Sequence, residues 1–101
     1  MIPSMRTINW SDRECVIDDD PEQIAAAVVA CAVDHSYDRG QTGVPWGLSD
    51  EERELCKPIV AKHLGAIDPE WRERTVYLTE VQKLAFRREV AAALTAGRSR
   101  A

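Results

Sequence analysis

Apolar residues recur at helical spacing in three stretches of the chain, and a clear start signal precedes the first. Asp20 can cap a helix, Pro21 suits the first helical position, and Asp18-Asp19-Asp20 places negative charge at the positive end of the helix dipole. The apolar positions that follow are spaced by three and four residues, as on one helical face. They are Ile24, Ala27, Val28, Cys31 and His35. The pattern predicts a helix over residues 21–37.

A second helix is predicted from Ser49 to about Leu64. Ser49 and Glu52 form a capping-box pattern, and Gly65 is a suitable residue to follow the helix. Pro58 falls inside this stretch, where a proline removes a backbone hydrogen bond and clashes with the preceding turn. We therefore expect either a kink at Pro58 or two shorter helices.

The last helix is predicted to begin after Thr79, because Thr79 and Gln82 form another capping-box pattern, and to end at Ala96 before Gly97. Its apolar residues fall on two faces. One face carries Val81, Leu84, Ala85 and Ala92 with Arg88 among them, and the other carries Phe86, Val90, Ala93 and Leu94. A helix of this kind either lies centrally in the domain or buries its second face against a partner or a second copy.

The remaining segments are predicted to form a loop, a turn and short extended segments. Residues 36–48 contain three glycines and a proline, so neither a helical nor a strand period continues through them, and they predict a long loop. Asp68-Pro69-Glu70 predicts a short helical turn through Trp71–Arg74. Cys15–Ile17 and Thr75–Leu78 look extended, which leaves open a minor two-stranded β element formed by the two segments.

The predicted fold is therefore mainly α: a compact bundle of three to four helices with a long loop that contains glycine, proline and tryptophan. At 101 residues and 45% hydrophobic content, the chain fits a single domain with one modest core. We expect residues 1–17 to form an N-terminal arm and residues 98–101 to form a frayed basic tail.

The compartment is predicted from hydropathy and cysteine usage. No apolar run reaches the length of a membrane span, and residues 1–10 lack a charged-then-apolar signal pattern. Three cysteines, Cys15, Cys31 and Cys56, without a CxxC pair argue against a disulfide framework and fit a reducing compartment. We expect a cytoplasmic protein that does not bind membranes.

The net charge of −4 is unevenly distributed along the chain. Residues 1–57 carry twelve Asp and Glu against five Lys and Arg, a net of −7, whereas residues 58–101 carry five against eight, a net of +3. An acidic first half repels nucleic acid and attracts a basic protein surface, and a basic last helix does the reverse.

Cysteine and histidine form the sharpest chemical pattern in the sequence. Cys31 and His35 are four residues apart and Cys56 and His63 seven apart, so two antiparallel helices could gather them around zinc. Cys31 lies among apolar residues, where cysteine behaves as a small hydrophobe, and we therefore expect core packing rather than a metal site. The sequence also lacks a phosphate-binding glycine loop, HExxH and G-x-S-x-G. We expect neither an enzyme nor a cofactor.

The predicted long loop is the first candidate binding segment. Tyr37 and Trp46 lie near its ends with Arg39 between them, and these residue types are enriched at binding hot spots. The alternative is that Trp46 folds into the core while the loop only connects two helices.

Carboxylates at the first two predicted helix starts are the second candidate surface. They cap helices and interact with the helix dipole, and they include Asp18, Asp19, Asp20, Asp50 and Glu51. If the two starts lie side by side, they make an acidic surface that fits a basic groove on another protein, including a groove that binds nucleic acid.

These features predict a small protein-binding module that blocks a partner protein with its acidic surface and aromatic loop. Inhibitors from phages and mobile elements have a similar composition. The alternative is a nucleic-acid-binding regulator that contacts phosphates through Lys83, Arg87 and Arg88 and dimerises through another face of the last helix. Direct binding of nucleic acid is less favoured because the chain as a whole is acidic.

Overall fold

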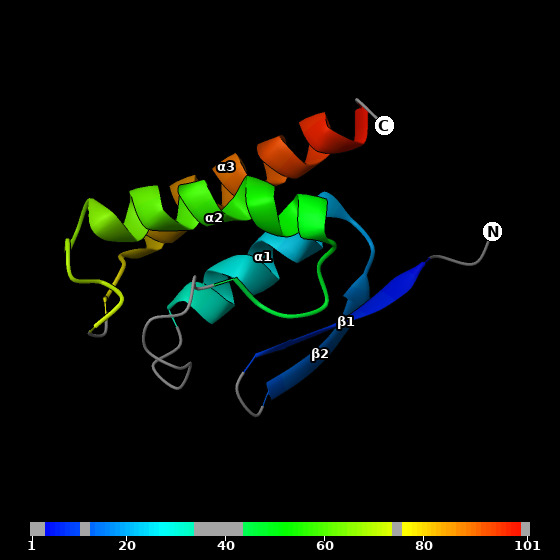
Figure 1. Cartoon of the computed structure of the whole chain (residues 1–101), viewed down its shortest axis with the longest axis horizontal. Coiled ribbons are helices and arrows are strands. Elements are labelled where there is room, and N and C mark those ends of the chain that lie inside the picture. The colour runs from blue at the N-terminus through cyan, green and yellow to red at the C-terminus, as the bar shows by residue number, and fades with distance from the viewer. Residues whose placement is uncertain (1–3, 11–12, 34–43, 74–75, 100–101) are drawn as a thin grey trace.

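A β-hairpin precedes three helices in the described part of the chain (Figure 1). The computed structural model describes residues 4–10, 13–33, 44–73 and 76–99. The hairpin consists of β1 (Met5–Trp10) and β2 (Arg13–Asp18), which pair antiparallel. The helices are α1 (Pro21–Ala32), α2 (Asp50–Gly65) and α3 (Glu80–Ser99). The prediction of a mainly α fold with a minor two-stranded β element is confirmed.

α3 contacts both α1 and α2 and runs antiparallel to each of them (Figure 1). The starts of α1 and α2 therefore meet the end of α3 at one end of the molecule. The centre of the core between the helices consists of side chains larger than alanine that are at most 2% exposed. They are Ile24 and Val28 of α1, Cys56, Val60 and Leu64 of α2, and Phe86, Val90 and Leu94 of α3. None of the helices in the described ranges has the length and apolar character needed to cross a bilayer.

The hairpin has an inner face that packs on α1. Ile8 and Trp10 are buried in a second cluster with Ala27 and Cys31 of α1. Cys15 packs against this cluster from β2. Because strand residues alternate between faces, the side chains next to these buried ones point away from α1.

The N-terminal part of the fold differs from the expectation. Residues 5–10 and 13–18 form the strands of the hairpin rather than an arm, because β1 contributes two side chains to the core. Cys15–Ile17 is extended as predicted, but its partner is β1 and not the segment before α3. Residues 76–78 of that segment form no strand.

The start of α2 is confirmed in detail. The Glu52 N–H donates to the Ser49 hydroxyl at 3.2 Å, and the Ser49 N–H donates to the Glu52 carboxylate at 2.8 Å. Pro58 does not divide the helix, so the expectation of two shorter helices is wrong. Pro58 is exposed, and water can reach the carbonyl of Glu54 that loses its helical hydrogen bond.

α3 starts as predicted but ends later. The Thr79 N–H donates to Gln82 Oε1 at 2.8 Å, and the Gln82 N–H donates to Thr79 Oγ1 at 3.1 Å. The helix continues through Gly97, which is buried, and an added Cβ there would lie 2.8 Å from Cδ1 of Leu55. Gly97 thus permits a close approach of α2 instead of ending α3, and Arg98 is helical rather than part of a frayed tail.

Three further local predictions are corrected. α1 ends at Ala32 instead of at residue 37. Asp20 occupies the N-cap position of α1 with an extended backbone, but its side chain makes no capping hydrogen bond. Residues 69–73 form turns rather than a helix, and the Trp71 N–H donates to the Asp68 carbonyl at 3.1 Å.

We expect Ser49→Ala to lower the free energy of unfolding by about 1 kcal/mol, because it removes the hydroxyl that accepts from the Glu52 N–H. Urea unfolding followed by circular dichroism measures the change. Ser49→Thr keeps a hydroxyl at the same position and should stay within about 0.5 kcal/mol of wild type. Equal losses in both variants would contradict the role of the capping box.

Candidate functional site

The starts of α1 and α2 are joined by the guanidinium group of Arg6, which lies between them. Its Nη2 donates to Asp19 Oδ1 at 2.8 Å, and its Nη1 donates to Glu52 Oε1 at 2.7 Å and to the Gly47 carbonyl at 3.4 Å. Arg98, in the last turn of α3, donates to the same Asp19 oxygen at 2.6 Å. Two arginines from distant parts of the chain therefore connect the hairpin with the ends of all three helices.

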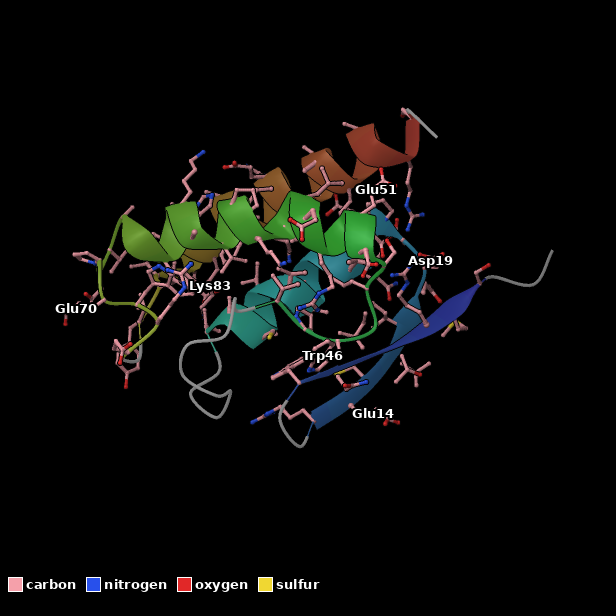
Figure 2. The ribbon with its side chains drawn as sticks, in the orientation of Figure 1. Glu14, Asp19, Trp46, Glu51, Glu70 and Lys83 are labelled. Carbon is pink, nitrogen blue, oxygen red and sulfur yellow. The ribbon has the colours of Figure 1, made fainter. Side chains whose placement is uncertain are left out.

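The structure thus brings the two predicted acidic helix starts together, and Figure 2 shows Asp19 and Glu51 at the same end of the molecule. Residues 18–22 and 50–52 carry seven carboxylates against the two arginines of this network. Asp19 is already paired, and the Asp18 carboxylate accepts from the Gln23 amide at 3.1 Å. Glu22, Asp50 and Glu51 are exposed, so they are the carboxylates of this group that a partner can reach most easily.

Pairing with arginine also changes the acidity of two carboxyls. Burial acts to raise the pKa of Asp19, but hydrogen bonds and charge from Arg98 and Arg6 outweigh it and leave the pKa below its ordinary value of 3.8. Burial likewise opposes the effect of Arg6 and Ser49 on Glu52, and its pKa lies below the ordinary 4.5. Both groups are therefore carboxylates near neutral pH, and their pairing stabilises the folded state there.

Trp46 lies beside β1 and forms an isolated antiparallel β-bridge with Asn9. The Asn9 N–H donates to the Trp46 carbonyl at 3.0 Å, and the Trp46 N–H donates to the Asn9 carbonyl at 2.7 Å. Arg53 of α2 places its guanidinium 4.6 Å from the centroid of the Trp46 ring and donates to the Pro45 carbonyl at 2.8 Å. Trp46 is nevertheless 57% exposed, so the alternative in which it fills the core is wrong.

Trp46 shares its face of the sheet with the outward side of the hairpin. Antiparallel partners project to the same face, and Asn9 pairs with both Glu14 and Trp46. The same alternation places the pairs Met5–Asp18 and Thr7–Val16 on this face. We call these residues the hairpin outer face: Met5, Thr7, Asn9, Glu14, Val16, Asp18 and Trp46.

The hairpin outer face has an apolar middle and acidic margins. Met5 is 55% exposed and Val16 is 63% exposed, and with Trp46 they account for three of the large hydrophobic side chains at the surface of the described residues. Glu14 and Asp18 carry negative charge on the same face. Labelled side chains in Figure 2 show Trp46 and Glu14 near the hairpin and Asp19 beyond it toward the acidic helix starts.

Gly47 allows the chain to run close along β1 after Trp46. Its φ of 101° lies in the left-handed region that favours glycine. A Cβ at this position would overlap the Thr7 carbonyl oxygen. The position of Trp46 therefore depends on a residue without a side chain immediately after it.

Two residues of the predicted aromatic loop, Tyr37 and Arg39, lie outside the described residues, as does His35 of the predicted zinc set. The other members of that set do not meet. Cys31 belongs to the hairpin cluster and Cys56 to the main core. In the described residues, no group of three or more His, Cys, Asp or Glu could hold a metal ion.

The two remaining candidates for chemistry, Cys56 and His63, have structural roles. Burial and, to a smaller extent, the charge of Glu52 raise the pKa of Cys56 to about 12, so its thiol stays protonated near neutral pH and is a poor nucleophile. His63 Nε2 lies 2.9 Å from Glu89 Oε1, and its ring stacks on Phe86 with 4.9 Å between centroids. This histidine links α2 to α3.

Two of the three basic residues of the alternative hypothesis share one side of α3. Lys83 pairs with Glu80 at 3.2 Å, and Lys83 and Arg87 line a groove between α1 and α3. Arg88 is exposed and shares the outward side of the helix with Leu84. Lys83 and Arg87 therefore share one groove, and Arg88 lies beside it on the exposed side of α3.

Sequence reasoning missed the hairpin outer face and the arginine network. A signal for the hairpin was present, because Met5–Trp10 is rich in strand-forming residues and is separated from the extended run at Arg13 by only two residues. No local signal could pair Arg6 with Asp19 and Arg98, since these contacts depend on how the elements pack.

Comparisons with protein-family models, curated proteins and solved structures found no match. The surface geometry is therefore the basis for a functional proposal.

We expect Arg6→Met to lower the free energy of unfolding at pH 7 by about 1–3 kcal/mol, because it removes the arginine at 2.7 Å from the largely buried Glu52 carboxylate, which keeps only the Ser49 N–H and Arg98 at 4.0 Å, and because it removes the contact to Asp19. Wild type should lose this stabilisation as the pH falls below the ordinary carboxyl values of 3.8 and 4.5, because the folded-state pKa values of Asp19 and Glu52 are depressed. The variant should show a shallower loss. Urea unfolding across a pH series measures both.

Arg88→Met is the matched control for this series, because Arg88 is exposed on α3 away from the network. Its free energy of unfolding should stay within about 0.5 kcal/mol of wild type and follow the same pH dependence. A pH profile of Arg6→Met that is parallel to that of wild type would show that Arg6 does not depress the two pKa values.

We expect Gly47→Ala to cost at least about 1–3 kcal/mol of stability through its positive φ alone, and also to displace Trp46, because the added Cβ overlaps the Thr7 carbonyl. Gly65→Ala is the control, since the nearest atoms to an added Cβ there lie at an ordinary 3.7 Å. Urea unfolding gives the stability, and iodide quenching follows Trp46, because Trp10 and Trp71 are buried. Unchanged stability and quenching in Gly47→Ala would contradict this role of the glycine.

Proposed function

We propose that this chain is a small protein-binding module that docks through the hairpin outer face, with Trp46 as its central contact. The observation that carries the proposal is that Trp46 is held by two backbone hydrogen bonds and by Arg53 while more than half of it stays exposed. A large side chain that is fixed before binding loses little conformational entropy in a complex, and tryptophan is enriched at binding hot spots.

The charges around Trp46 indicate the kind of partner. Glu14 and Asp18 border the apolar middle of the hairpin outer face, and Asp50 and Glu51 extend the acidic surface beyond it. A complementary partner has an apolar depression flanked by Lys or Arg. We propose that the protein acts as an inhibitor that occupies such a basic groove, including a groove that otherwise receives nucleic acid.

The proposed setting is the cytoplasm, where thiols stay reduced. All three cysteines lie in the described part of the chain and are present as thiols. Tyr37 and Arg39 stay in the proposal as further contacts that their own alanine variants would test.

We expect Trp46→Ala to weaken partner binding by about 1–4 kcal/mol while leaving the fold intact, because it removes an exposed anchor and no core side chain. The partner is captured on immobilised wild-type protein from a nuclease-treated lysate of the source cells. The binding constants of wild type and variants for the purified partner are then measured by calorimetry.

Tyr77→Ala is the matched control, because Tyr77 is 76% exposed but precedes α3, at the end of that helix away from the acidic helix starts. It should bind as wild type does. Val16→Ser, which replaces an apolar side chain on the same face as Trp46 with a polar one, should weaken binding. Equal affinity of wild type, Trp46→Ala and Val16→Ser would overturn the proposed surface, and retention that disappears with nuclease would favour a nucleic-acid ligand instead.

A further inference from the structure

α3 has an outward side that the other described elements leave exposed. Val81 is 79% exposed and Leu84 36% exposed, and Ala85 and Ala92 are also at the surface. Val81, Ala85 and Ala92 lie on the opposite side of the helix from Phe86, and Leu84 lies at the edge of this side, next to α1. An apolar helix side of this kind is typical of an interaction surface.

A groove of about 510 Å³ runs beside this side of α3, between α3 and α1. Small and apolar side chains of α1 line one wall: Ala26, Val29, Ala30 and Val33. The α3 wall consists of Glu80, Lys83, Leu84 and Arg87. Leu84 therefore belongs to both the groove and the outward side of α3, and charged residues lie next to it.

Glu80 and Arg87 have opposite signs and lie in opposite directions from Leu84 along α3, and Lys83, which also lines the groove, pairs with Glu80 of its own chain at 3.2 Å. Glu80 comes four residues before Leu84 and Arg87 three residues after it, and at about 100° per residue both fall on the groove side of Leu84. Val81 and Arg88 fall on the other side, again one turn before and one turn after. Turning α3 end over end about Leu84 therefore places the Glu80 carboxylate near the position that the Arg87 guanidinium occupied.

We propose that this surface binds a second copy of the chain, with the two α3 helices antiparallel and a two-fold axis at Leu84. In this arrangement Leu84 meets Leu84 of the second copy, and Glu80 of each chain lies beside Arg87 of the other. The methylene groups of Arg88 cover the exposed Val81 of the other chain. A two-fold interface must be complementary to itself, and the opposite charges on one side of Leu84 meet that condition.

Small residues also favour this occupant. Ala85 and Ala92 border Leu84 and Arg88 on the outward side of α3, and Ala26 and Ala30 line the facing wall of the groove. Two helices can approach closely where the side chains between them are small. The second copy uses α3 and the adjoining groove, and it leaves the hairpin outer face accessible to the partner of the proposed function.

The test is a charge exchange followed by sedimentation equilibrium. Wild type should move with rising concentration from the 11.3 kDa of one chain toward twice that mass. Glu80→Arg and Arg87→Glu each place like charges together and should raise the dissociation constant at least about 10-fold. An equimolar mixture of these two variants restores both pairs and should associate at least as tightly as wild type.

The controls separate this interface from other surfaces. Glu73→Arg makes the same change of charge outside α3 and should dimerise as wild type does. Trp46→Ala should also dimerise, so a failure of the proposed partner surface does not affect this test. Circular dichroism checks that each variant keeps its helices.

Three results would overturn the proposal. One is a wild-type protein that stays monomeric up to about 1 mM, where even a weak association would be detected. Another is a dimer whose dissociation constant neither Glu80→Arg nor Arg87→Glu changes, because it would use a different surface. The third is a mixture of the two variants that associates no better than either variant alone.

Discussion

Ile8 and Trp10 of β1 lie against Ala27 and Cys31 of α1, and this apolar contact fixes which side of the hairpin meets solvent. Because strand side chains alternate, burying these two residues turns Thr7, Asn9 and their cross-strand partners outward. The backbone pairing of Asn9 with Trp46 then places the indole on the same side. The exposure of Trp46 is thus a consequence of how the hairpin is anchored.

The arginine network connects this anchored hairpin to the acidic helix starts. Arg6 reaches from β1 to both starts, and Arg98 reaches Asp19 because α3 continues through Gly97. The two guanidiniums reduce the repulsion between carboxylates that are crowded at one end of the molecule. They leave an excess of negative charge there, and this excess is what favours a basic partner.

Local signals predicted the helices better than the surfaces. The capping boxes at Ser49 and Thr79 gave the starts of α2 and α3, because a cap depends on residues that are adjacent in sequence. The end at Gly97 was predicted wrongly because a glycine that ends a helix and a glycine that lets another helix approach look alike in sequence. The exposed Trp46 and the contacts of Arg6 depend on long-range packing, which spacing along the chain does not encode.

The central claim is that a partner covers Trp46, and the most direct measurement is iodide quenching of tryptophan fluorescence with and without the purified partner. Trp10 and Trp71 are 6% and 3% exposed, so Trp46 dominates the quenching of the free protein. If the hairpin outer face is the binding surface, saturation with the partner should remove most of this quenching. A saturated complex in which iodide still quenches Trp46 as in the free protein would contradict the account.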